Sequence, residues 1–136
     1  VVKDNAERNR LTFGGKYEND KLTVRSEYIY GETGMGDRKA GEYYLLESDG
    51  FYVAAGYWFN YTCKKTGLQH KIRPVARYDF FREDITEVNT NSTYYMVGID
   101  WWPMQNLRLL VNYTLKDKVA NDNFGHLFQA LLSVKF

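Results

Sequence analysis

The 136-residue sequence has one cysteine, Cys63, and only two prolines. A single cysteine cannot form a disulfide within the chain, and Cys63 has no histidine or carboxylate at a spacing that suits a metal ion. We therefore expect no metal site and no cofactor, and we interpret Cys63 as a thiol beside a turn. Because proline interrupts the hydrogen bonds of a β-sheet, its scarcity is compatible with long strands.

The sequence also lacks long hydrophobic runs and a marked excess of either charge. No apolar run approaches the roughly 18 residues of a transmembrane helix, so no such helix is predicted. The formal net charge is +1, which gives no reason to expect a nucleic-acid partner. The sequence patterns of hydrolases, metalloproteases and phosphate-binding loops are missing, and we expect no enzyme activity.

Aromatic residues, by contrast, make up 17% of the chain, and apolar and polar residues alternate along much of it. A period of two places the two kinds of side chain on opposite faces of a strand. The alternation predicts seven strands, at residues 10–18, 21–31, 51–61, 68–81, 93–102, 107–116 and 124–136. Without any helical period, the predicted fold is all-β, antiparallel and up-and-down, with the pairing bulged or broken at Pro74.

The last predicted strand, FGHLFQALLSVKF, has an apolar residue at every second position and ends in phenylalanine. This pattern resembles the closing strand of bacterial outer-membrane β-barrels. The resemblance implies that the strand carries the signal read by the barrel assembly machinery. The signal residues would be Phe128, Leu132, Val134 and Phe136.

Alternation alone does not separate a membrane barrel, which is apolar outside, from a soluble barrel with an apolar ligand inside. Three features favour a transmembrane barrel in the bacterial outer membrane. The predicted connections alternate between about two to six and roughly seven to eighteen residues, the longest being the excursion over 32–49. The strands are long enough to cross a bilayer when tilted. Apolar-face aromatics beside the short turns form an expected girdle at the membrane interface: Tyr17, Phe59, Tyr61, Trp101 and Phe136.

Seven strands conflict with the even strand number of bacterial single-chain barrels and leave an unpaired edge in lipid. We therefore expect the chain to be the C-terminal part of a larger barrel, or to receive its remaining strands from other chains. An eighth strand within residues 1–9 or 43–47 is the remaining alternative.

Positive charge is concentrated on the polar face, where nine predicted cations stand against four predicted anions. If this face lines a lumen, its field favours anions. The candidate pore-lining and anion-binding residues are Arg25, Lys71, Arg73, Arg77, Arg108 and Lys116. The alternative is that the charges pair internally, as Arg25 with Glu27 and Arg77 with Asp79. Aromatic residues on the same face either stack sugars or fill space: Tyr52, Trp58, Tyr94 and Trp102.

Four consecutive segments, IRPVARYDFF, YYMVGIDWWP, NLRLLVNYTL and the final strand, resemble the last four strands of the phosphate-selective porin O and P family. The residues that carry the resemblance are Pro74, Arg77, Tyr78, Asp79, Gly98, Asp100, Trp101, Pro103, Asn106, Arg108, Asn112 and Tyr113. The resemblance implies a segment of a 16-stranded, trimeric porin that contacts membrane lipid. It further implies passive diffusion of small anionic or polar solutes, with a mild preference for phosphate or other small anions. A barrel that conducts nothing and serves only as structure is the alternative.

Overall fold

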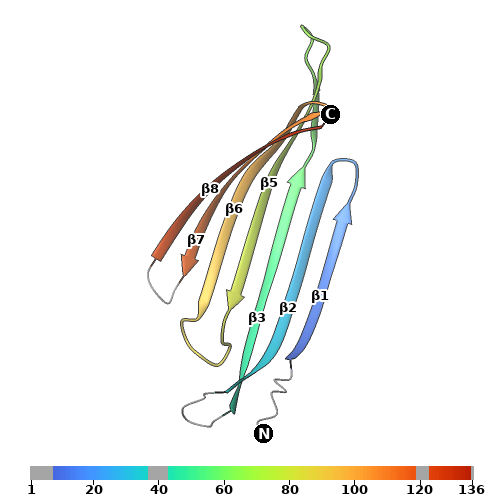
Figure 1. The fold of residues 1–136 in the computed structure, drawn as a ribbon. Coiled ribbons are helices and arrows are strands. Elements are labelled where there is room, and N and C mark those ends of the chain that lie inside the picture. The colour runs from blue at the N-terminus through green and yellow to red at the C-terminus, as the bar shows by residue number, and fades with distance from the viewer. Residues whose placement is uncertain (1–7, 37–42, 119–122, 136) are drawn as a thin grey trace.

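The computed structural model describes residues 8–36, 43–118 and 123–135, which form strands and turns only. The strands are β1 (Arg8–Glu18), β2 (Leu22–Gly36), β3 (Tyr43–Tyr57), β4 (Phe59–Thr62), β5 (Gln69–Arg82), β6 (Asn91–Met104), β7 (Leu107–Lys118) and β8 (Asn123–Val134). They pair antiparallel in the order β1-β2-β3-β5-β6-β7-β8 (Figure 1). The short strand β4 pairs with β5. The prediction of an all-β, antiparallel, up-and-down fold is confirmed.

No helix in the described part of the chain is long and apolar enough to cross a membrane.

Both prolines lie at irregularities of the sheet. Strand β4 continues β3 without a change of register, because Gly56 pairs with Val75 and Phe59 pairs with Ile72. The ladder is interrupted between these pairs, opposite Pro74, where a local break or a bulge was predicted; the structure has the break. The bulge lies instead in β6, where the register to β7 shifts between Trp101 and Met104, beside Pro103.

The prediction of a long loop over residues 32–49 is wrong. Strand β2 continues to Gly36 and β3 already begins at Tyr43, with Glu32 paired to Glu47 along the extension. Residues 43–47 are therefore the start of β3 and not an eighth strand. The other suggested eighth strand, at residues 1–9, lies mostly outside the described residues, and β1 begins at Arg8.

The two ends of the sheet differ in their connections less than predicted. One end has connections over 19–21, 63–68 and 105–106, and the other over 37–42, 83–90 and 119–122. We call these the turn end and the loop end. At the turn end, the side-chain Oδ1 of Asn19 accepts hydrogen bonds from the backbone of Lys21 (2.9 Å) and Leu22 (2.7 Å), which closes the hairpin between β1 and β2.

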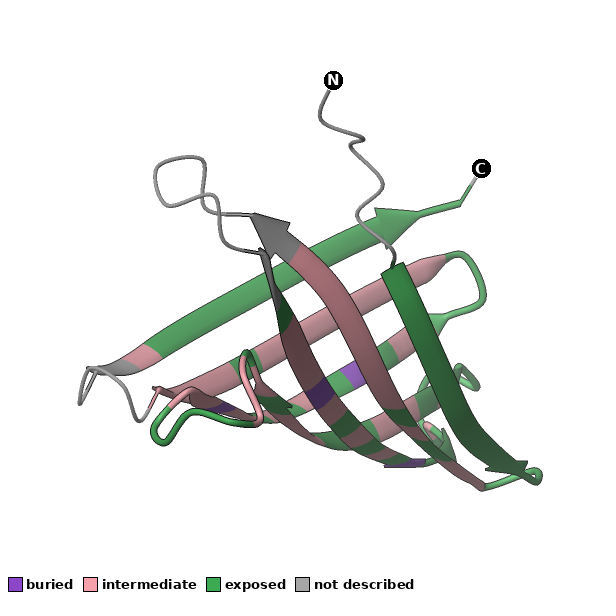
Figure 2. Cartoon of the chain, turned by 90° about the horizontal axis from the view of Figure 1, so that it is seen from below, coloured by how far each residue is buried: buried purple, intermediate pink, exposed green. Residues whose placement is uncertain are grey.

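The sheet curves into an open arc with β1 and β8 at its two edges (Figure 2). Neither edge strand has a second partner in the described residues. The face that carries Arg25, Arg77 and Asp100 holds the hollows of the molecule, and we call it the inner face. The opposite, outer face carries the apolar positions of each strand.

Burial on the two faces is the reverse of that in a water-soluble protein. On β6 the outer-face residues Val97 and Ile99 are 57% and 52% exposed, whereas Asp100 on the inner face is 1% exposed. Among the described residues, no hydrophobic side chain is buried. A soluble barrel with an apolar ligand inside would need an apolar inner face, whereas here the inner face carries Arg25, Arg77 and Asp100.

Candidate pore wall

The register brings Asp100 of β6 between two arginines from neighbouring strands. Arg73 donates from Nη2 to Asp100 Oδ2 at 2.8 Å, and Arg108 donates from Nε to Oδ1 at 2.8 Å and from Nη2 to Oδ2 at 3.0 Å. The indole N–H of Trp102 donates to Oδ1 at 3.1 Å. Two guanidinium groups on one carboxylate leave this cluster with one excess positive charge, fixed in the wall by charge-assisted hydrogen bonds.

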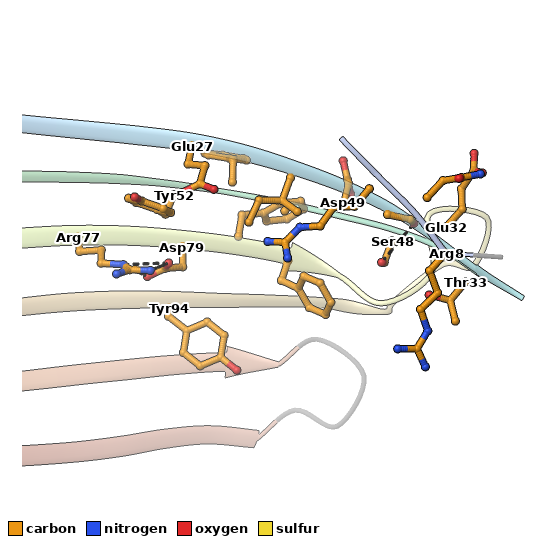
Figure 3. A pocket seen from close by; sticks show the side chains of 18 of the residues that line it. Arg8, Glu27, Glu32, Thr33, Ser48, Asp49, Tyr52, Arg77, Asp79 and Tyr94 are labelled. Atoms are coloured by element: carbon orange, nitrogen blue, oxygen red, sulfur yellow. Dashed lines mark hydrogen bonds and ion pairs between the residues drawn. The ribbon is translucent and has the colours of Figure 1, made fainter. Parts of the chain in front are cut away.

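A second arginine–carboxylate pair lies closer to the loop end. Arg77 donates from Nε to Asp79 at 2.8 Å, and both residues lie in a hollow of about 740 Å³ on the inner face (Figure 3). Tyr52 and Glu27 reach the same hollow from β3 and β2, and Tyr94 lines it from β6. The predicted internal pairing of Arg77 with Asp79 is therefore present.

Each of the four aromatic residues that the sequence placed on the polar face lies against a cation. Arg77 lies over Tyr52 at 4.4 Å and Arg73 lies over Trp58 at 4.5 Å, measured from guanidinium carbon to ring centroid. The other two pairs are Lys116 over Tyr94 at 5.2 Å and Arg108 over Trp102 at 5.5 Å. Cation–π contacts hold the arginine and lysine side chains against these rings. The sequence alone did not indicate these contacts.

The remaining predicted pore-lining residues have no carboxylate partner in the described part of the chain. Arg25 and Lys71 are exposed on the inner face, and Lys116 contacts only the Tyr94 ring among the interactions found. The suggested pairing of Arg25 with Glu27 does not form, although the two side chains share a face. Of the six predicted residues, Arg73, Arg77 and Arg108 are paired and the other three keep an uncompensated charge.

The outer face carries the predicted girdle residues at the turn end. Tyr17, Phe59 and Tyr61 are 53–60% exposed there. His70 stands between Tyr61 and Trp101, with ring centroids 6.3 and 6.2 Å away, and is stacked on the latter. Of the predicted assembly-signal residues, Phe128, Leu132 and Val134 line up on the outer face of the edge strand β8. Phe136 lies outside the described residues.

The apolar band of the outer face ends at an ion pair that was not predicted. Arg82 donates to Asp49 from Nε at 2.6 Å and from Nη2 at 2.7 Å, and Tyr28 donates its hydroxyl to the same carboxylate at 3.1 Å. From Phe51, next to this pair, to Tyr61 at the turn end, the outer-face residues of β3 and β4 carry no charge. At about 3.3 Å per residue and a tilt of about 40°, that length gives a band about 25 Å high.

An uncharged outer band of bilayer height, aromatic residues at its margin and a cationic inner wall together define a segment of an outer-membrane porin. The sequence profile of the phosphate-selective porin O and P family matches residues 5–125. The chain belongs to that family, as the resemblance in its last strands predicted. No curated protein matches the chain. No solved structure matches it either.

Proposed function

We propose that this chain forms part of the wall of a passive diffusion channel with a mild preference for anions, phosphate or other small anions among them. The pore-lining residues in this proposal are Arg25, Lys71, Arg73, Arg77, Arg108 and Lys116. The observation that supports it is the charge of the inner face. Three of these cations lack a carboxylate partner in the described chain, and the cluster at Asp100 adds one further excess charge.

The proposal needs a closed barrel, because an unpaired strand edge is not stable in lipid. We propose that further strands pair with β1 and β8, in a 16-stranded barrel that assembles as a trimer as the family resemblance implies. The assembly machinery would read the outer-face residues of β8. The apolar outer band would contact lipid, and the inner face would contact water and solute.

The test is the reversal potential of the complete porin in a planar bilayer under a tenfold gradient of potassium chloride. We expect a potential of the sign that chloride permeation gives, and a smaller one for Arg25→Gln. Lys64→Gln in the connection 63–68 is the matched control, because it removes a cation outside the lumen, and it should leave the potential unchanged. A cation-selective current would overturn the proposal. An inserted barrel without current would favour the purely structural alternative.

A further inference from the structure

A separate, smaller hollow lies on the inner face at the turn end. Its volume is about 260 Å³, and five residues line it: Asp20, Trp58, Asn60, Lys71 and Trp102. Sites for drug-sized ligands usually exceed about 300 Å³, so the size of this hollow suits a single small ring. We call it the turn-end hollow.

Trp58 reaches this hollow from the break between β3 and β4. Its backbone N–H donates to the carbonyl oxygen of Lys21 at 2.7 Å, which continues the pairing of β2 with β3 by one residue. Trp58 therefore lies next to the connection 19–21, whose Asp20 is exposed and carries the one negative charge of the lining.

The other three lining residues form one row across neighbouring strands. Lys71 on β5 pairs in register with Asn60 on β4 and with Trp102 on β6, so the three side chains share the inner face. The indole N–H of Trp102 donates to Oδ1 of Asp100 at 3.1 Å, which fixes the ring. The row thus sets an ammonium group and an amide group beside an indole.

An arginine covers one face of each indole. Arg73 lies over Trp58 at 4.5 Å, and Arg108 lies over Trp102 at 5.5 Å. Both arginines line a neighbouring hollow of about 350 Å³, and neither lines the turn-end hollow. The surface that each indole presents to the turn-end hollow is therefore not occupied by an arginine, and a solute can pack on it.

The chemistry of the lining favours a neutral ring that carries hydroxyl groups. In the described structure no ion pair joins Asp20 to Lys71, but their charges sum to zero, so neither an anion nor a cation has an advantage. A purely apolar solute would displace water from the carboxylate, amide and ammonium groups without replacing its hydrogen bonds. A sugar ring has C–H groups that pack on an indole, and hydroxyls that both donate and accept.

We infer that the turn-end hollow binds neutral sugars, one ring at a time. The ring lies against Trp58 and Trp102, and its hydroxyls bond to Asp20, Asn60 and Lys71. This solute class goes beyond the anions of the proposed function. The inference rests on that function only in requiring an inner face open to water, and it does not require the channel to prefer anions.

The test is saturation-transfer-difference NMR of the complete porin in detergent micelles, with methyl β-glucoside as the ligand. We expect saturation on the C–H protons of the sugar ring, and at least about fivefold less on mannitol, an open-chain polyol without a rigid ring face. Trp58→Leu and, separately, Trp102→Leu should each lower the glucoside signal at least about threefold, because each removes one indole surface. Tyr94→Leu is the matched control, since it removes an inner-face ring outside this hollow, and it should keep the signal. Far-UV circular dichroism confirms that each variant is folded.

Equal signals from the glucoside and mannitol would overturn the inference, and this comparison needs no variant to fold. Persistence of the glucoside signal in both tryptophan variants, or its loss in folded Tyr94→Leu, would also overturn it, because the sugar would then bind elsewhere. The reversal potential tests the proposed function separately. A channel that gives the glucoside signal but does not select anions would end the proposed function and leave the inference standing. An anion-selective channel without the signal would do the opposite.

Discussion

Arg73 on β5 and Asp100 on β6 face each other in register, and Nη2 of the arginine donates to Oδ2 of the aspartate at 2.8 Å. The carboxylate is 1% exposed, while the arginine keeps 27% of its side chain accessible. Asp100 therefore acts as an anchor that holds the arginine on the wall, while part of the arginine side chain stays exposed on the inner face.

Replacing this anchor should raise anion selectivity and lower stability together. In Asp100→Asn the negative charge is lost, and the amide group turns N–H donors toward guanidinium donors. We expect the reversal potential to move further toward that of chloride and the free energy of unfolding to fall by about 1–3 kcal/mol. Reversal potentials and denaturant unfolding in detergent micelles measure the two effects.

The matched control is Asp79→Asn, because the Arg77–Asp79 pair is 41% and 27% exposed. Because water already solvates much of this pair, Asp79→Asn should lower the free energy of unfolding by less than about 1 kcal/mol. Equal destabilisation by the two variants would contradict the anchoring role of Asp100.

Gly98 should not tolerate a methyl group. A Cβ at this position would clash with Oδ1 of Asn112 and would lie 2.8 Å from the carbonyl oxygen of Val111. Overpacking of this kind predicts that Gly98→Ala loses about 1–3 kcal/mol of stability. Adding Asn112→Ala should recover part of the loss, since only the backbone contact remains. Gly125→Ala serves as control, because its nearest contact would be an ordinary 3.6 Å to Lys116.

A new charge should destabilise the folded protein on the outer face but not on the inner face. Val97 and Thr114 lie on adjacent strands but on opposite faces. Val97→Lys places an ammonium group near the middle of the apolar band and should destabilise the folded protein in bilayers by about 2–4 kcal/mol. Thr114→Lys adds the same charge to the water-lined face and should change stability by less than about 0.5 kcal/mol. The contrary order would mean that the faces are assigned the wrong way round.

The three tryptophans provide an optical test of the girdle. Trp101 lies on the outer face at the turn end, whereas Trp58 and Trp102 lie against arginines on the inner face. Lipids brominated near the head group should quench the emission of the protein, and Trp101→Phe should remove most of that quenching. Trp102→Phe should leave it largely intact. If both variants retain the quenching equally, Trp101 is not at the membrane interface.

The faces of the strands were predictable from the sequence, because lipid on one side and water on the other enforce a period of two. The same reasoning explains the error at residues 32–49. In the proposed channel both faces of the sheet meet water beyond the Asp49–Arg82 pair, so no alternation is imposed on Glu32–Gly36 or Tyr43–Glu47. Backbone pairing alone extends β2 and β3 there.

The contacts of the pore wall were predictable only where they are local. Arg77 and Asp79 are two residues apart on one strand, so their pairing follows from alternation. The cluster around Asp100 joins Arg73 and Arg108 from two other strands, and needs the register of three strands. Register depends on turn geometry and on the bulge beside Pro103, which the pattern of the sequence does not position, whereas the break opposite Pro74 was predicted.

The central claim is that one face of each strand meets water in a lumen and the other meets lipid, and a cysteine scan along β6 tests it most directly. The pKa of Cys63 is lowered by hydrogen bonds from the Thr66 side chain and the backbone of Lys65 and Thr66. A lower pKa increases the fraction of thiolate, the form that maleimides modify, so the scan starts from Cys63→Ser. Single cysteines at positions 94 to 97 and at position 99 in the complete porin, in lipid vesicles, are then treated with a membrane-impermeant maleimide. Positions 94 and 96 should react and positions 95, 97 and 99 should be protected. Uniform reactivity, or protection of 94 and 96 alone, would contradict the account.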